Sequence, residues 1–252
     1  MIEAPAVFKI ERGSQRAFFD HGWLKTYHSF SFADYMDPKN INWGALRVLN
    51  DDTVAAGKGF GTHPHQDMEI ITYVLNGQLE HQDSTGAHGV VGPGGVQYMS
   101  AGTGVRHSEF NHSKTEPLHF LQMWVLPGKL GVPPSYGQAD FTEEQRHNKW
   151  LVVASGMKGT PAAIELAQNA AMSVAHLVDG KVSYDFGTGR MGFVFVASGN
   201  ATVSTSDSGN ESYSLSSGDA ARISGIGHIT VAGNAEIVLW DVPPMYTDEM
   251  DV

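Results

Sequence analysis

An internal repeat of short β-like segments constrains the fold more than any other feature of this sequence. Three segments of the first half recur in the same order in the second half, at an offset of about 120 residues. They are residues 72–86 with 194–209, 90–104 with 214–227, and 120–127 with 236–243. Each set reads as a strand, a glycine turn and a second strand. The sequence therefore predicts two copies of one β unit.

Short runs of β-branched and aromatic residues, each ended by Gly, Asn or Pro, fill both halves. The clearest are residues 45–50, 69–77, 95–102, 119–128, 149–156, 192–203, 220–225 and 235–244. Many short strands at regular spacing favour an all-β sandwich or barrel. Residues 140–148 read as a turn of helix, and residues 160–178 are compatible with either a helix or a strand.

The length of 252 residues allows one large β domain or two domains of about 100–150 residues each. The repeat favours two, and the polar stretch rich in Pro and Gly between residues 127 and 148 is the expected boundary. We place the domains at residues 1–130 and 131–252. With no cysteine in the chain, any metal must be held by nitrogen and oxygen ligands.

Sixteen Lys and Arg against 27 Asp and Glu give a net charge of −11, and the basic residues are scattered singly. A nucleic-acid binder usually presents a basic patch, so direct binding to nucleic acid or to an anionic membrane is disfavoured. The first 15 residues do not read as a signal peptide, and no apolar stretch of about 18 residues is present. We expect a cytoplasmic protein.

Two same-face pairs of metal-ligating residues stand out in the first half. His63 and His65 lie two apart in a run that reads as a strand, and so do His107 and Glu109. Side chains at i and i+2 of a strand share a face. A single H-x-H is more often chance or a surface patch. Two pairs on neighbouring strands, however, would place three imidazoles and a carboxylate around one point, a set that suits a divalent transition metal.

Other candidates are weaker. Glu69 has the same parity as His63 and His65, but four residues of strand would carry it about 13 Å from His65. His81 and Asp83 read equally well as a hydrogen-bonding pair or a functional one. The remaining histidines stand alone; they include His88, His112, His119, His176 and His228. No metal site is readable in the second half.

The first pair lies in a stretch that resembles the first cupin motif, G-x5-H-x-H-x(3,4)-E-x6-G. The matching residues are Gly57, His63, His65, Glu69 and Gly77, with seven residues rather than six before the last glycine.

The second cupin motif ends in H-x3-N, which His107 and Asn111 match. Its preceding P-x-G-x2-H is altered, because Ser100 replaces the proline and four residues separate Gly102 from His107. This altered form resembles the pirin family of bicupins. The chain is similar to the bacterial pirin-like proteins with quercetin 2,3-dioxygenase activity, most clearly over residues 20–126.

The resemblance implies a bicupin, with two double-stranded β-helix (jelly-roll) domains and one metal site in the N-terminal one. The implied ligands are His63, His65, His107 and Glu109, rather than Glu69. One divalent transition metal per chain is implied, with iron the first choice ahead of copper, nickel, zinc, manganese or cobalt. The implied reaction uses O2 to cleave a flavonol such as quercetin, releasing carbon monoxide, with Glu109 accepting the proton of the 3-hydroxyl.

Two other functions stay open. Pirins are also described as partners of transcription or metabolic proteins, so a metal-binding regulatory or interaction protein is the first alternative. A non-oxidative cupin, an isomerase or a hydrolase, is the second. We expect some of the apolar side chains of the first copy to line a pocket, from a set that comprises Phe60, Tyr73, Met99, Phe110, Phe120, Met123 and Trp124.

Overall fold

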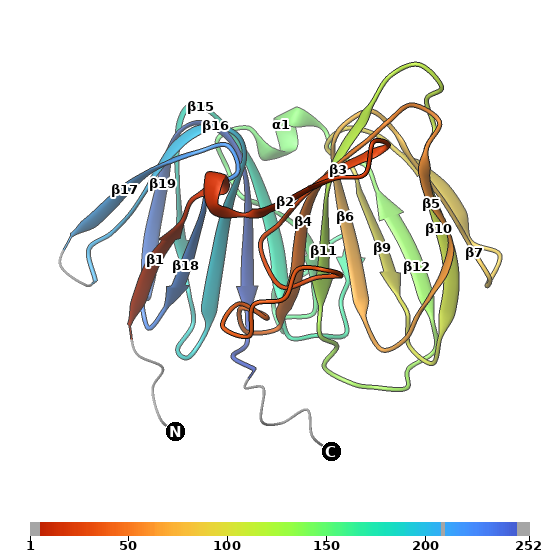
Figure 1. The fold of residues 1–252 in the computed structure, drawn as a ribbon. Helices are drawn as coiled ribbons and strands as arrows, with labels where there is room; N and C mark the ends of the chain where they lie inside the picture. Colours follow the sequence, from red (N-terminus) through yellow and green to blue (C-terminus); the bar gives the residue numbers. More distant parts are fainter. Residues whose placement is uncertain (1–5, 208–209, 246–252) are drawn as a thin grey trace. The chain divides into compact units, whose positions relative to one another are not determined.

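The computed structural model describes residues 6–207 and 210–245 (Figure 1). They form two compact units. Residues 16–42 and 46–141 make up the first barrel, and the described parts of 1–15, 43–45 and 142–252 make up the second barrel. The protein is thus all-β and built from two barrels, as predicted.

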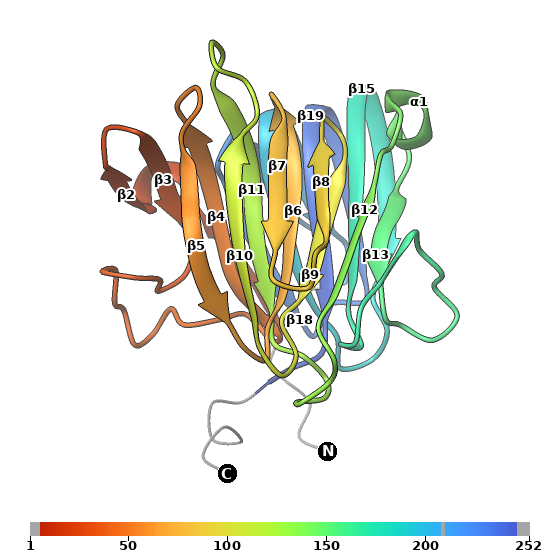
Figure 2. The same ribbon diagram turned by 90° about the vertical axis from the view of Figure 1, so that its right-hand side faces the viewer.

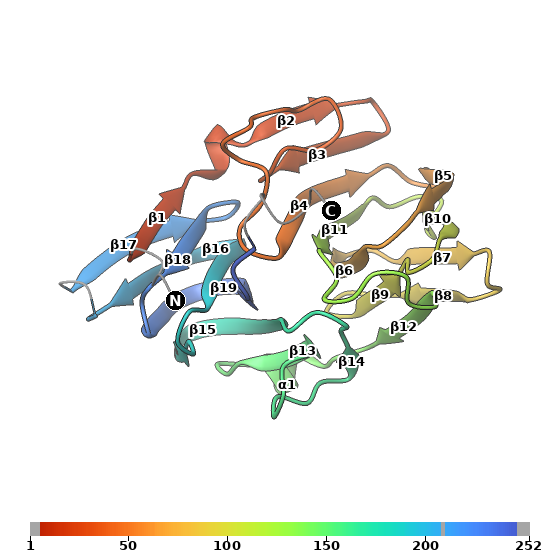
Figure 3. The ribbon, with the colours of Figure 1, turned by 90° about the horizontal axis from the view of Figure 1, so that it is seen from below.

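The first barrel consists of two sheets that face each other (Figure 3). The larger sheet contains, in spatial order, β12 (Ser135–Ala139), β9 (Val96–Ser100), β6 (Glu69–Asn76), β11 (Leu118–Val125), β4 (Leu46–Val54), β3 (Leu24–His28) and β2 (Ala17–Asp20). The smaller sheet, in front in Figure 2, contains β5 (Gly59–His65), β10 (Val105–Asn111), β7 (Leu79–Asp83) and β8 (His88–Val91). A cluster that includes Val74, Leu79 and Phe120 fills part of the space between them.

The second barrel is built from one sheet with three strands of 15 residues. Its spatial order is β1 (Val7–Glu11), β18 (Ala220–Ser224), β16 (Met191–Thr205), β19 (His228–Val242), β15 (Ala171–Asp185), β13 (Leu151–Ser155) and β14 (Ile164–Glu165), while β17 (Glu211–Ser216) pairs with the far half of β16. Register shifts interrupt the long strands near Leu177 and Val196. Both halves of each long strand then contribute to one apolar core.

The strand order is the same in the two barrels, which agrees with the predicted duplication. The order β12-β9-β6-β11-β4 of the first barrel corresponds to β1-β18-β16-β19-β15 of the second. Likewise β5-β10-β7-β8 corresponds to the far halves of β15, β19 and β16 followed by β17.

The domain boundary between residues 130 and 131 stays a prediction. Two strands pair across that position in the sequence. Strand β1 pairs with β18, so the start of the chain completes the second barrel. Strand β12 pairs with β9, so the first barrel continues to residue 141.

The two segments with helical character resolve differently. Residues 140–148 contain the expected turn of helix, α1 (Glu143–Arg146), and a 3-10 turn lies at η1 (Gly13–Gln15). Residues 160–178 contain β14 and the start of β15, because the alternating second half pairs with β19 and β13. Within the described residues, no helix has the length and apolar character needed to cross a membrane.

Candidate metal centre

The stretch from His63 to Tyr73 is two strands rather than the single strand that the sequence suggested. Strand β5 ends at His65, and β6 begins at Glu69 in the other sheet. Asp67 makes the turn with a φ of 44°, a left-handed conformation that Asp tolerates better than most residues. Its carboxylate accepts a hydrogen bond from the Gly131 backbone nitrogen at 2.7 Å, which holds the turn in place.

Three histidines converge at the β5–β10 pair. His63 lies directly opposite His107 in the ladder, and the Nε2 atoms of the two rings are 3.1 Å apart. The His65 ring lies 4.8 Å from the His63 ring and 4.9 Å from the His107 ring, measured between centroids. One ring nitrogen from each residue falls within 4.8 Å of the other two, so the three could hold a metal ion.

Hydrogen bonds behind two of these rings leave the Nε2 lone pairs free for a metal. His63 Nδ1 lies 2.8 Å from the Gly61 carbonyl oxygen, a contact in which Nδ1 donates. His81 Nε2 lies 3.3 Å from the Asp83 carboxylate, and its Nδ1 lies 3.4 Å from His107 Nδ1. In a neutral His81 that donates to Asp83, Nδ1 is an acceptor, so His107 Nδ1 donates to it. Such outer contacts commonly orient metal-binding histidines.

The environment keeps two of the rings neutral. Burial, with the neighbouring rings of His107 and His63, lowers the pKa of His65 to about 4. Burial, followed by the rings of His63 and His81, lowers the pKa of His107 to about 3. Because a metal binds the deprotonated imidazole, these rings are in the form that coordination requires.

Glu109 lies near the histidines and is held by two glutamines. Gln97 donates to one carboxylate oxygen at 2.6 Å, and Gln122 donates to the other at 2.7 Å. A carboxylate oxygen accepts two hydrogen bonds, so each retains a position for a metal or a substrate proton. Glu109 lies within 4.8 Å of ligand atoms of His107 and His81, as a second overlapping group, and not of all three converging histidines.

The sequence reasoning missed both glutamines. The available signal was a polar residue inside an otherwise apolar strand, since Gln97 and Gln122 interrupt β9 and β11 and are 2% and 9% exposed. A buried polar side chain of this kind is kept only where it has a partner.

Glu69, the alternative carboxylate, points away from this site. It lies three residues before Thr72 on β6, so its side chain leaves the opposite face of the strand. Thr72 pairs with Gln97 and Gln122 and therefore shares their face. The Tyr98 hydroxyl donates to Glu69 at 2.7 Å on the far side.

A cavity of about 530 Å³ opens beside the histidines. Its aromatic lining residues are Trp23, Phe32, Phe60 and Trp124, and His63, His65 and Glu109 also line it. Of the apolar residues expected to line a pocket, Phe60 and Trp124 do so. The other five do not line this cavity; Tyr73, Met99, Phe120 and Met123 are buried, and Phe110 is partly exposed.

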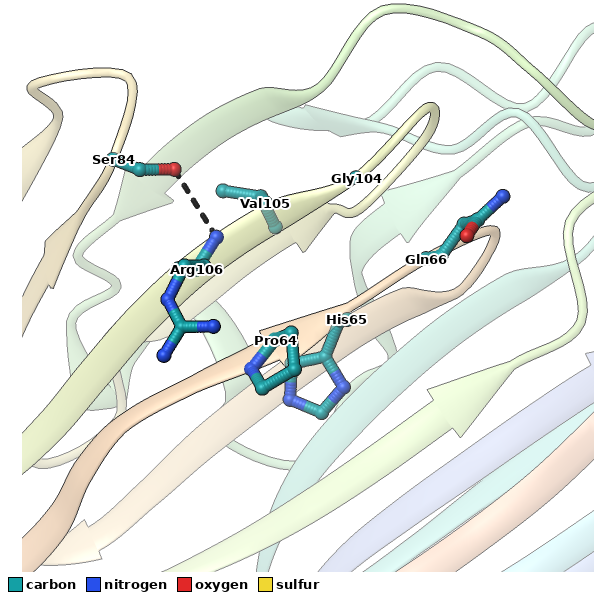
Figure 4. Close-up of a pocket in the computed structure, with 7 residues that line it drawn as sticks. All are labelled: Pro64, His65, Gln66, Ser84, Gly104, Val105 and Arg106. Carbon is teal, nitrogen blue, oxygen red and sulfur yellow. Dashed lines mark hydrogen bonds between the residues drawn. The ribbon is translucent and has the colours of Figure 1, made fainter.

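A second hollow of about 430 Å³ adjoins the ends of β5 and β10, and His65 lines both hollows. Figure 4 shows its lining, in which the Arg106 backbone nitrogen donates to Ser84 Oγ at 3.1 Å.

The second barrel contains a group that the sequence did not predict. Glu143, His147 and His176 place ligand atoms within 4.8 Å of one another, although the sequence showed no metal site there. The two histidines are far apart in sequence and meet through a parallel bridge. Unlike His107, both Glu143 and His147 are exposed to solvent.

The other single histidines lie outside these groups. His112 faces Glu80, His119 faces Asp51 and His228 faces Asp185, each through a partly exposed hydrogen bond, and His88 is exposed.

Comparison with known proteins places this arrangement in a family. Residues 10–125 match the family model described as Pirin, and residues 151–242 match the one described as quercetinase C-terminal cupin domain. A quercetin 2,3-dioxygenase of Escherichia coli K12 is 40% identical over 94% of this chain and 99% of its own length. The chain belongs to the pirin family.

Two further pirin relatives support the same placement. A pirin-like protein of Caulobacter vibrioides is 42% identical over 88% of this chain and 94% of its own length. The crystal structure of the bacterial pirin YhhW from Escherichia coli in complex with nickel(II) superposes with a TM-score of 0.84. That match has 37% identity and covers 95% of this chain and 100% of the other.

Proposed function

We propose that the first barrel binds one divalent transition metal and uses O2 to cleave a flavonol such as quercetin. His63, His65, His107 and Glu109 would hold the ion. The observation that carries the proposal is the convergence of three imidazoles, two of which, His63 and His65, line an aromatic-lined cavity. A quercetin 2,3-dioxygenase and a nickel-binding pirin among the relatives support it.

The donor set fits such an ion. Two of the three rings have lowered pKa values, and hydrogen bonds behind His63 and His107 direct their Nε2 atoms into the group. Imidazole and carboxylate suit iron, nickel, copper, manganese, cobalt and zinc, and iron is our first choice. When bound, the metal supplies a Lewis acid for the flavonol 3-hydroxyl and a site at which the flavonol and O2 meet.

The residues of the chain have separate tasks. Glu109 accepts the proton of the 3-hydroxyl, because a free position on its carboxylate faces the cavity. Gln97 and Gln122 hold that carboxylate in place. The aromatic rings of Trp23, Phe60 and Trp124 contact the flat substrate and orient it.

Two measurements made on the same preparation test the proposal. Metal content by mass spectrometry should give about one transition-metal ion per chain in the first barrel, and quercetin should cause stoichiometric O2 uptake. One metal per chain without O2 uptake would refute the dioxygenase and favour a regulatory metal-binding protein. Metal-dependent turnover of a substrate without O2 uptake would favour a non-oxidative cupin.

A further inference from the structure

One wall of the large cavity carries polar side chains that the proposed reaction does not use. Thr26, His28, Asn50 and Asp52, on β3 and β4, all line the cavity and are no more than 5% exposed. We call these four residues the polar wall. They are direct ladder partners, Thr26 with Asp52 and His28 with Asn50.

Each residue of the polar wall has a buried atom without a hydrogen-bond partner outside the wall in the described parts of the chain, and within the wall the Thr26 hydroxyl interacts with the Asp52 carboxylate. These atoms are Thr26 Oγ1, His28 Nδ1, Asn50 Oδ1 and Asp52 Oδ1. A buried polar group left unpaired destabilises the folded protein. Groups of this kind gathered on one cavity wall, His28 Nδ1 and Asn50 Oδ1 above all, are therefore expected where a bound molecule provides the missing partners.

The polar wall lies one to two strands away from the residues that hold Glu109, a distance that suits a substrate of two or three rings. Gln122, which holds Glu109, is the ladder partner of Asn50, and Asn50 is the partner of His28. Neighbouring strands are about 4.8 Å apart, so the wall extends from one to two strand spacings beyond Gln122. A planar molecule of two or three rings spans that distance.

The chemistry of the wall favours hydroxyl groups. Asn50 Oδ1 and Asp52 Oδ1 accept hydrogen bonds, and Thr26 both donates and accepts. Burial, opposed by the Thr26 hydrogen bond and reinforced by the charges of Asp51 and Glu109, raises the pKa of Asp52 to about 7, so below that pH the protonated Asp52 also donates. Phenolic hydroxyls are donors and acceptors and match both roles.

We propose that the polar wall binds hydroxyl groups on the rings of the substrate remote from the metal, and so selects polyhydroxylated aromatic molecules. This inference rests on the proposed function in one respect, which is that the 3-hydroxyl end of the substrate faces the metal. Its test is a binding measurement that does not depend on turnover.

The experiment compares quercetin with 3-hydroxyflavone, which keeps the 3-hydroxyl and the adjacent ketone but lacks the other ring hydroxyls. Binding to the metal-loaded protein is measured without O2 by quenching of tryptophan fluorescence, since Trp23 and Trp124 line the cavity. We expect quercetin to bind roughly 10-fold more tightly. Asn50→Ala and Asp52→Ala should reduce that ratio toward one, and Asp52→Asn should restore part of it.

Ser29→Ala is the matched control. Ser29 Oγ is also buried and unpartnered in the described structure, but it does not line the cavity, so the ratio should stay at the wild-type value. Thermal unfolding distinguishes a role in binding from a role in stabilising the fold, because removal of an unpartnered polar group should not lower the melting temperature. A wild-type ratio near one, or an unchanged ratio in both Asn50→Ala and Asp52→Ala, would overturn the inference.

The outcomes also separate this inference from the proposed function. Selective binding of quercetin without O2 uptake would support the polar wall and reject the dioxygenase. O2 uptake with equal affinity for both compounds would support the dioxygenase and reject the polar wall as a binding site. Failure of both compounds to bind would overturn both proposals.

Discussion

At the ladder position where the first barrel has His107 opposite His63, the second barrel has Ile229 opposite Tyr184. The strands correspond, β10 to β19 and β5 to β15, because the two barrels share one strand order. Ile229 is fully buried in the apolar core, with Tyr184 packed against it.

Two residues further along β10 and β19, the pairs with the strands on the other side, β7 and β16, differ in the same way. Glu109 lies opposite His81 in the first barrel, and Val231 lies opposite Val203 in the second. Both valines are fully buried in the core of the second barrel. One backbone plan thus supports a polar cavity in one copy and a packed interior in the other.

The polar residues on the strands that face Glu109 also have apolar counterparts in the second barrel. Gln97, Thr72 and Gln122 correspond in the ladder to Ala221, Val194 and Leu239. A charged side chain facing the interior requires donors around it, whereas an apolar one does not. The proposed metal ligands and the residues that hold them therefore differ together between the two barrels, and substitutions can convert one copy toward the other.

The largest expected effect comes from His107→Ile, which places the second-barrel residue in the first barrel. His107 belongs to both overlapping ligand groups, so we expect metal content to fall from about one ion per chain to less than a tenth, with loss of any O2 uptake. Metal is measured by mass spectrometry and folding by circular dichroism. A folded variant that keeps one ion per chain would contradict the assignment, unless His147→Ala added to it removes that ion.

Glu109→Gln and Glu69→Gln form the next test. Glu109→Gln removes the proposed proton acceptor, so we expect kcat/KM with quercetin to fall by roughly 10²–10⁴-fold. Glu69 faces the other side of its sheet, so Glu69→Gln should keep the metal and most of the activity. The reverse result would mean that the carboxylate of the first cupin motif is the functional one.

His81→Val tests the contact behind His107 and again copies the second barrel. Loss of the acceptor for His107 Nδ1 should weaken metal binding by roughly 10–100-fold, measured by competition with a chelator. His112→Val is the control, because His112 is a partly exposed histidine that pairs with Glu80 outside the site. Equal metal affinity in the wild type and His81→Val would show that His81 does not orient His107.

The smallest expected effect concerns Asp52, whose ladder equivalent in the second barrel is Ala175. Its pKa of about 7 in the folded protein lies above its ordinary value of 3.8. The unfolded chain therefore loses this proton first as the pH rises, and the folded state is penalised progressively from about pH 4 to pH 7. In metal-free protein, Asp52→Ala should raise the melting temperature by a few degrees at pH 8 and by less at pH 4. An equal shift at both pH values would contradict the raised pKa.

The sequence was sufficient for the strand pattern, the duplication and the convergence of His63, His65 and His107, because these depend on local alternation and motif spacing. It failed where a turn or a register decides the outcome. The positive φ of Asp67 divides one apparent strand into two.

The third repeated segment shows the same limit. Sequence similarity equates Trp124 with Trp240, but by strand pairing Trp124, opposite Ile70, occupies the position that Asp241, opposite Gly192, occupies in the second barrel. A shift of one residue reverses the face of a strand, and Trp124 alone of the two tryptophans lines the cavity. The glutamines around Glu109 and the polar wall depend on cross-strand pairing, which one sequence does not reveal.

The pairing of β1 with β18 has a consequence for biosynthesis. Val7 lies opposite Ser224, so the first strand leaves the ribosome long before its partner exists. At about 5–20 residues per second, that delay is on the order of 10–40 seconds. All strands of the first barrel are complete by residue 139, so it is free to fold during this interval. The second barrel closes only after residue 224 has been made, with the first barrel inserted between β1 and the later strands of the second.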